Sequence, residues 1–296
     1  MNDFAGDLLN RGLLQDCTAN AIFPTLLTPQ TLYCGFDPTS DSLHLGSLQM
    51  IMLCRRFQNA GHKIIALVGG GTGLIGDPSG KADERLLKSD KEVRQLAEAI
   101  KSQIRQLLPD AEIVDNRAWI EEMSAISFLR DVGKHFTINS MLAKDSVSSR
   151  QLGGEGISFT EFSYMLLQAL DFATLFDKGA TIQLGGSDQW GNITAGISLI
   201  RKTRGKEAHG ITSPLLLKSD GTKFGKSESG TVWLAKEKTS AFALFQFLLN
   251  VSDEDVIPLL KKLTLRSLEE IEQLSNTKKH LRLSELTPQL KQRGFR

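Results

Sequence analysis

Short apolar runs alternate with longer amphipathic stretches along the first two thirds of the chain. The apolar runs of strand length are residues 31–36, 63–68, 112–114 and 181–184. The stretches with helical periodicity are residues 43–60, 90–108 and 158–176. Because strands that alternate with helices form parallel sheets with helices packed on their faces, the pattern predicts an α/β fold with a parallel sheet.

From about residue 236 onward the pattern is helical, without a clear strand. A lysine-bearing loop at residues 223–227 precedes this change, and we place a domain boundary near residues 215–235. A smaller all-helical part is therefore expected after the α/β domain. The last twenty residues carry six Lys or Arg side chains and one acidic side chain, which is typical of a solvated tail.

The helix predicted at residues 158–176 carries polar side chains on an otherwise apolar surface. Ser158 and Glu161 have the spacing of a capping box, which marks the start of the helix. Tyr164, Gln168 and Asp171 then follow at intervals that place them on one face. Buried polar groups need hydrogen-bond partners. The stripe therefore indicates either a hydrogen-bonded core network or a pocket for a small ligand.

Composition narrows the possible classes of protein. The chain has 296 residues, of which 41% are apolar, enough for one large domain and a smaller one. A net charge of +1 gives no overall preference for nucleic acid, so any RNA contact requires a local patch. The three cysteines lack C-x-x-C spacing, which argues against a zinc site or a disulfide framework. No targeting peptide or membrane span is recognisable, and we expect no membrane or DNA partner.

Two short motifs are suited to binding a polyphosphate. His44-Leu45-Gly46-Ser47 opens a helix directly after a strand and a turn-rich loop, where free N–H groups and the helix dipole favour an anion. Lys223-Phe224-Gly225-Lys226-Ser227 is a cationic, glycine-containing loop. Each motif is weak alone, but their order and separation are typical of a class I aminoacyl-tRNA synthetase.

Longer runs resemble the bacterial-type tyrosyl-tRNA synthetases. The matching runs are residues 33–39, 43–46, 66–70, 72–80, 128–136, 156–164, 185–192 and 220–226. The resemblance implies a Rossmann-like catalytic domain at 1–220, with an insertion at about 119–185 that forms a dimer interface in the family. A helical part at 221–296 would follow, beginning with the lysine loop. It also implies a cytoplasmic homodimer that acts on tyrosine, ATP and tRNA(Tyr).

The implied reaction has two steps, formation of tyrosyl-adenylate and transfer of the tyrosyl group to the 3′ end of tRNA(Tyr). The attacking carboxylate has a pKa of about 3.5 and needs no general base at neutral pH. The protein must therefore position the reactants and stabilise charge on the phosphates. Mg²⁺ is expected to arrive with ATP rather than in a site formed by the protein.

The family's site residues carry over to matching positions of this chain. The resemblance implies that the phosphates are contacted by Thr39, His44, Lys81, Arg85, Lys223 and Lys226. It implies an ATP site formed by Gly35, Asp37, His44, Ser47, Gly186, Asp188 and Lys226, with Cys34 against the ribose. For tyrosine, it implies Tyr33 and Asp171 at the phenolic hydroxyl, Asp77, Tyr164 and Gln168 at the ammonium, and Gln189 near the carboxylate.

Two departures from the family pattern affect these expectations. Ser47 replaces a second histidine of the first motif, which predicts a modest cost in ATP affinity or rate. Family members usually continue into a helical domain and a small S4-like RNA-binding domain, whereas this sequence ends at residue 296. We therefore expect intact adenylate formation and weak tRNA charging. The alternatives are an enzyme of the same fold with another amino acid substrate, and a non-catalytic RNA-binding relative.

Overall fold

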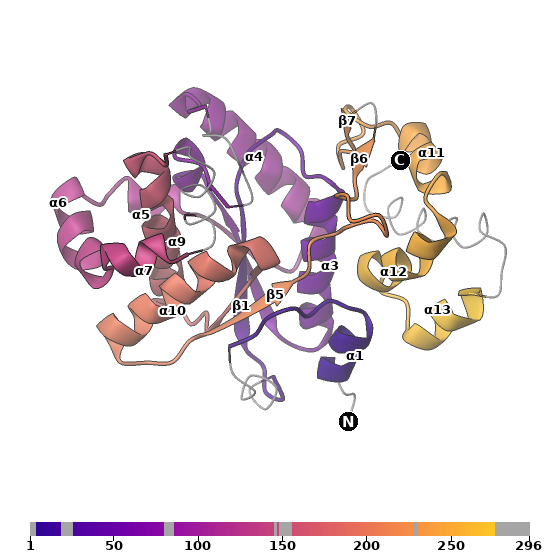
Figure 1. Ribbon diagram of the computed structural model, residues 1–296, viewed down its shortest axis with the longest axis horizontal. Helices are drawn as coiled ribbons and strands as arrows, with labels where there is room; N and C mark the ends of the chain where they lie inside the picture. Colours follow the sequence, from indigo (N-terminus) through magenta and orange to yellow (C-terminus); the bar gives the residue numbers. More distant parts are fainter. Residues whose placement is uncertain are drawn as a thin grey trace.

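The computed structural model describes residues 4–18, 26–79, 86–144, 147, 156–227 and 230–275, with the backbone alone at 226, 227 and 275 (Figure 1). Its centre is a five-stranded parallel sheet in the order β3-β2-β1-β4-β5. The strands are β1 (Thr31–Phe36), β2 (Lys63–Val68), β3 (Glu112–Asp115), β4 (Ile182–Gly186) and β5 (His209–Ser213). This strand order is that of a Rossmann-like fold, so the predicted fold class is confirmed.

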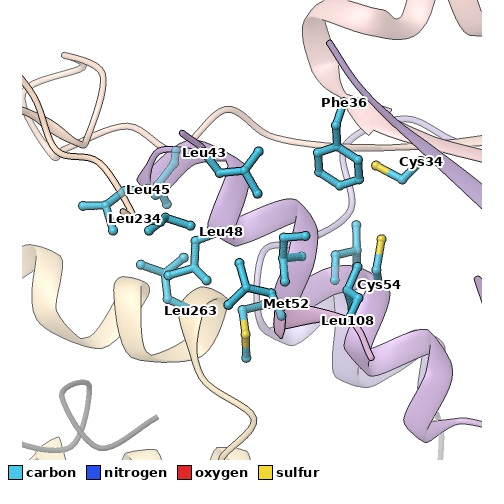
Figure 2. Packing of buried hydrophobic residues seen from close by; sticks show 14 of the residues in the cluster. Cys34, Phe36, Leu43, Leu45, Leu48, Met52, Cys54, Leu108, Leu234 and Leu263 are labelled. Carbon is cyan, nitrogen blue, oxygen red and sulfur yellow. The ribbon is translucent and has the colours of Figure 1, made fainter. Parts of the chain in front are cut away.

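Alternate residues of the strands pack against helices on the two faces of the sheet. Leu32, Cys34 and Phe36 of β1 belong to one apolar cluster, together with α3 (Leu45–Asn59) and α4 (Asp90–Leu107). Figure 2 shows part of this cluster. Tyr33 belongs to the other cluster, together with α9 (Phe159–Asp177) and α10 (Trp190–Arg204). Side chains alternate between the faces of a strand. A strand covered on both faces is apolar on both, as β2 is after its exposed first residue, Lys63.

The starts of the long helices follow from their first residues. The Ser158 side chain accepts from the N–H of Glu161, which confirms the predicted helix start and the serine half of the capping box. Ser89 caps α4 in the same way. His44 is the N-cap of α3, so the histidine of the first motif lies at the helix terminus.

Short helical segments connect β3 to α9. They are α5 (Arg117–Ile120), α6 (Ala125–Ser127), η2 (Phe128–Val132), η3 (Gly133–His135) and α7 (Ile138–Leu142). This is the region where the sequence predicts an insertion. It carries several large apolar side chains that are more than half exposed, namely Ile126, Leu129 and Ile138.

The chain after β5 forms a small hairpin and three helices at one end of the molecule (Figure 1). The hairpin pairs β6 (Lys226–Ser227) with β7 (Gly230–Thr231), and the helices are α11 (Ala241–Leu249), α12 (Asp253–Leu263) and α13 (Leu268–Ser275). The predicted helical pattern after residue 236 is therefore confirmed as far as residue 275, and the predicted basic tail, residues 277–296, lies outside the described residues. Arg11, which follows α1 (Phe4–Asn10), and Arg56 of α3 donate to the backbone carbonyls of Arg266 and Thr264, which follow α12. These bonds connect the helical part to the sheet domain.

Candidate active site

Two adjoining cavities open at the carboxyl ends of β1 and β4. The inner cavity has a volume of about 200 Å³ and the outer cavity about 250 Å³. Gly35, Asp37, Met50 and Gly186 line both of them. From β1 the chain builds the sheet outward to β3 on one side, and it then returns to add β4 and β5 on the other side. Open parallel sheets bind their ligands at the carboxyl ends of the two strands where this change of direction occurs.

One end of the inner cavity is built around the carboxyl group of Asp171, which is 2% exposed. The side-chain amide of Asn116 donates to one of its oxygens at 2.9 Å, and the indole N–H of Trp119 donates to the other at 2.8 Å. Burial raises the pKa of Asp171 to about 7, although these two donors act in the opposite direction. A carboxylate can accept about four hydrogen bonds, so Asp171 keeps capacity for a ligand.

The hydroxyl of Tyr33 lies at the same end. It is buried and has no hydrogen-bond partner among the described residues. The Tyr33 ring packs edge-on against Phe172, with ring centroids 5.2 Å apart. Burial and then the nearby charge of Asp171 raise the pKa of Tyr33 well above its ordinary value, so the hydroxyl keeps its proton. A buried hydroxyl without a partner costs about 1–3 kcal/mol, which a ligand oxygen would recover.

A chain of amide and carboxylate groups lines the other end of the inner cavity. Gln189 donates to Asp77 at 2.7 Å and accepts from Gln168 at 3.2 Å. Asn192 donates to the Gln168 oxygen at 3.0 Å. Tyr164 donates instead to Asp37, at 2.7 Å. The polar stripe of α9 is thus both hydrogen-bonded and exposed to a cavity, so the two interpretations left open by the sequence each describe part of it.

The glycine-rich loop that follows β2, residues 69–73, lies directly against this polar network. Asp37 accepts from the Thr72 hydroxyl at 2.8 Å, and Thr72 accepts from Asn116 at 2.9 Å. A Cβ atom on Gly69 would lie 1.9 Å from the Asp37 carboxylate, so only glycine fits there. The Thr72 hydroxyl and the close approach of Gly69 therefore hold Asp37 at the junction of the two cavities.

His44 lines the outer cavity at the N-terminus of α3. Its Nδ1 accepts from the N–H of Ser47 at 3.3 Å, so the neutral ring carries its proton on Nε2. Partial burial, and then the positive charge of Lys223, lower the pKa of His44. Burial and then the charge of Asp77 raise the pKa of Asp188, while Lys223 lowers it. The outer cavity thus combines a neutral N–H donor, a helix N-terminus and a nearby lysine, which suits an anion.

Most residues that the sequence predicts for the site line one of the two cavities. In the inner cavity these are Tyr33, Cys34, Gly35, Asp37, Asp77, Tyr164, Gln168, Asp171, Gly186 and Gln189. In the outer cavity these are Gly35, Asp37, Thr39, His44, Ser47, Gly186 and Asp188. Lys223 acts on His44 and Asp188 through its charge. Lys81, Arg85 and the side chain of Lys226 lie outside the described residues.

Several site residues were not predicted from the sequence. Asn116 and Trp119 donate hydrogen bonds to Asp171, and Thr72 donates to Asp37. Asn192 donates to Gln168, which itself donates to Gln189. Asn116 directly follows β3 at the ligand-binding edge of the sheet, and this position could have identified it. Among the described residues, no group of three potential metal-ligating side chains converges. None of the described helices is long and apolar enough to cross a membrane.

Comparison with known proteins gives consistent matches. A family model described as "tRNA synthetases class I (W and Y)" matches residues 27–293. Tyrosine–tRNA ligase of Bacillus caldotenax is 55% identical over 282 residues, which are 92% of this chain and 67% of the relative. That of Aliivibrio salmonicida is 52% identical over 280 residues, which are 91% of this chain and 66% of the relative. A C-terminally truncated mitochondrial tyrosyl-tRNA synthetase from Aspergillus nidulans has a TM-score of 0.86 at 26% identity, over all of this chain and 91% of that one. This chain spans about two thirds of the length of the curated relatives.

Proposed function

The chain belongs to the tyrosine–tRNA ligases of the class I tRNA synthetases, and we propose that its two cavities bind tyrosine and ATP side by side to form tyrosyl-adenylate. The inner cavity receives tyrosine and the outer cavity receives ATP. They meet at Asp37 and Gly186, where the carboxylate of tyrosine would face the α-phosphate of ATP.

The observation that carries this proposal is that the Tyr33 hydroxyl, without a hydrogen-bond partner among the described residues, and the Asp171 carboxylate lie at the same end of the inner cavity. A phenol offers both a donor to Asp171 and an acceptor to Tyr33. Phenylalanine would leave the Tyr33 hydroxyl buried without a ligand partner, at a cost of about 1–3 kcal/mol, and would not make the hydrogen bond that a phenol donates to Asp171. An indole N–H could donate to Asp171 but would leave the Tyr33 hydroxyl unpaired. Tyrosine therefore fits this end better than phenylalanine or tryptophan.

The length of the cavity also suits tyrosine. Tyr164 and Asp171 are seven residues apart on α9, about 10 Å along the helix axis. Asp77, Gln168 and Gln189 lie away from the phenol end, where the ammonium and carboxylate of a bound tyrosine would lie. The ammonium would replace or join the amide donors that now contact the Asp77 carboxylate.

Adenylate formation then depends on placement and charge. The ionised tyrosine carboxylate attacks the α-phosphorus without a general base, and pyrophosphate leaves. His44 would donate from Nε2 to a phosphate oxygen, together with Thr39 in the loop before α3 and Ser47 in the first turn of α3. Lys223, Lys226, Lys81 and Arg85 would supply positive charge to the leaving pyrophosphate. Asp188 and Gly186 would hold the ribose hydroxyls, with Mg²⁺ bound to the phosphates of ATP.

We extend the proposal to assembly and organisation. The catalytic domain would comprise residues 1–220, and the lysine loop and helical part residues 221–296. The exposed apolar side chains between β3 and α9 would form the homodimer interface. The tyrosyl group would pass to tRNA(Tyr) in the cytoplasm. Size measurement of wild type and Ile126→Glu by light scattering tests the interface, since a charged side chain there would yield monomers.

Amino-acid-dependent ATP–pyrophosphate exchange tests the proposed chemistry. We expect exchange with tyrosine and little with phenylalanine or tryptophan at equal concentration. Tyr33→Phe and Asp171→Asn should reduce the preference for tyrosine over phenylalanine. Exchange that is supported equally by all three amino acids would contradict the assignment of the inner cavity. Absence of exchange in folded protein with Mg²⁺ would instead favour the non-catalytic RNA-binding alternative.

A further inference from the structure

The segment that follows the hairpin β6–β7, residues 232–238, forms hydrogen bonds with the loop that precedes α3. The N–H of Leu234 donates to the carbonyl of Leu43 at 2.8 Å, and the N–H of Ala235 donates to the Ser42 hydroxyl at 3.0 Å. His44 and Trp233 also form an isolated antiparallel bridge. Two segments nearly 200 residues apart in the sequence thus meet at the histidine of the first motif.

Side chains strengthen this junction. Lys238 forms an ion pair with Asp41 at 2.5 Å, and its ammonium lies 5.0 Å from the centre of the Trp233 ring. The Trp233 ring in turn packs near His44, with centroids 6.5 Å apart. The ion pair lowers the pKa of Asp41. We call Asp41, Trp233 and Lys238 the latch.

The same segment also contacts the backbone of the lysine loop. The N–H of Val232 donates to the carbonyl of Gly225 at 2.8 Å, and Thr231 of β7 pairs with Lys226 of β6. The backbone at Lys226 is therefore connected through β7 to Trp233, and from there to His44. The positions of the two motifs, residues 44–47 and 223–227, therefore depend on the same set of contacts.

We propose that Trp233 and Lys238 are positioning residues for adenylate formation, which hold His44 and the backbone of the lysine loop at a fixed separation. This inference rests on the proposed function, because it assumes that both motifs act on the phosphates of ATP. None of the three latch residues lines the inner cavity, and none lines the outer one. The latch should therefore affect the placement of phosphate-binding groups in the transition state more than the ground-state binding of either substrate.

Substitution of Lys238 by methionine tests the proposal with a matched control. Methionine keeps most of the side-chain length but removes the charge, and so removes the ion pair and the cation–π contact. Lys236→Met is the control, because Lys236 is exposed in the same segment and forms no ion pair with any described residue. We expect tyrosyl-adenylate formation in Lys238→Met to be about tenfold slower, since an ion pair and a cation–π contact each contribute up to about fivefold. The dissociation constants of tyrosine and ATP should change less than about twofold, and Lys236→Met should match wild type.

A charge exchange separates positioning from general loss of structure. Asp41→Asn alone should reproduce most of the Lys238→Met defect, and the double variant Asp41→Lys/Lys238→Asp should recover part of the rate. Equal rates in Lys238→Met and Lys236→Met would overturn the proposal, as would parallel losses in rate, substrate affinity and melting temperature. A wild-type protein without tyrosine-dependent exchange would refute the proposed function itself. A wild type that is active, with latch variants that are equally active, would refute only the positioning role.

Discussion

The buried carboxyl group of Asp171 should make tyrosine binding depend on pH. Its pKa is raised to about 7 by burial, so the free protein carries a proton on Asp171 below neutral pH. A phenol that donates to this group binds best to the ionised form, and the proton must then be released. For a single group with this pKa, the apparent dissociation constant of tyrosine rises about tenfold between pH 8 and pH 6.

The same pKa also predicts the direction of a stability change in the ligand-free protein. The folded-state pKa of about 7 lies above the ordinary value of 3.8, so between these pH values the folded state holds a proton that the unfolded state has released. The free energy of unfolding therefore falls as pH rises from about 4 to 7 and levels off above that window. At 1.36 kcal/mol per pKa unit, the shift corresponds to about 4 kcal/mol. Asp171→Asn removes this contribution.

Calorimetric titration with tyrosine at pH 6, 7 and 8, and urea unfolding at pH 5 and 8, measure both effects. Asp177→Asn is a suitable control, because Asp177 ends the same helix but pairs with Arg204 at the surface. We expect Asp177→Asn to keep the wild-type pH profiles and Asp171→Asn to flatten them. Equal tyrosine affinity of the wild type at pH 6 and pH 8 would refute the reasoning, as would an unchanged pH dependence of stability in Asp171→Asn.

Substitutions at three other positions separate the contributions of the two cavities. Tyr33→Phe should raise the free energy of unfolding of the ligand-free protein by about 1 kcal/mol, because it removes a buried hydroxyl that has no partner in the described part of the chain. It should also weaken tyrosine binding about tenfold. Urea unfolding and calorimetry measure the two changes, and a less stable variant would contradict the first. His44→Asn should keep the helix cap but lose the Nε2 donor, so rapid-quench assays should show adenylate formation about 100-fold slower at a nearly unchanged melting temperature. Ser47→His should increase ATP affinity about threefold in equilibrium titrations, since an imidazole can stack on the nucleotide. An unchanged affinity and rate would mean that residue 47 affects neither ATP binding nor adenylate formation.

The sheet was largely predictable because its strands are short apolar runs between helical stretches. Strand β5 is the exception. Its sequence, His209 to Ser213, contains Gly210 and polar residues, so it has no apolar run of its own. It forms because β4 provides a partner on one side and Thr18 accepts from the N–H of Gly210 on the other. Local sequence does not record such a tertiary contribution.

The arrangement of the site residues was predictable from the sequence only where those residues lie on a single helix or strand. Tyr164, Gln168 and Asp171 share a face of α9, and helical periodicity alone shows this. Their partners come from elsewhere in the chain: Asn116 and Trp119 lie some 50 residues before Asp171, on the segment after β3. No periodic pattern connects that segment to α9, so the sequence could not distinguish a satisfied network from a ligand pocket.

The inner and outer cavities differ in how deeply their polar side chains are buried, and this difference matters for the function proposed for each. Tyr33 and Asp171 project from the interior of β1 and α9 and are almost completely buried, so the groups that we propose to select tyrosine are fixed before it binds. His44 and Lys223 lie at a helix terminus and on a loop, both exposed, and the contacts that place them include an exposed ion pair of the kind that is individually weak. Selection among amino acids requires a rigid ground-state fit, whereas phosphate chemistry requires groups that reach their positions in the transition state. Moderate heating or denaturant should therefore slow adenylate formation before it weakens tyrosine binding, because the outer half loses its geometry first.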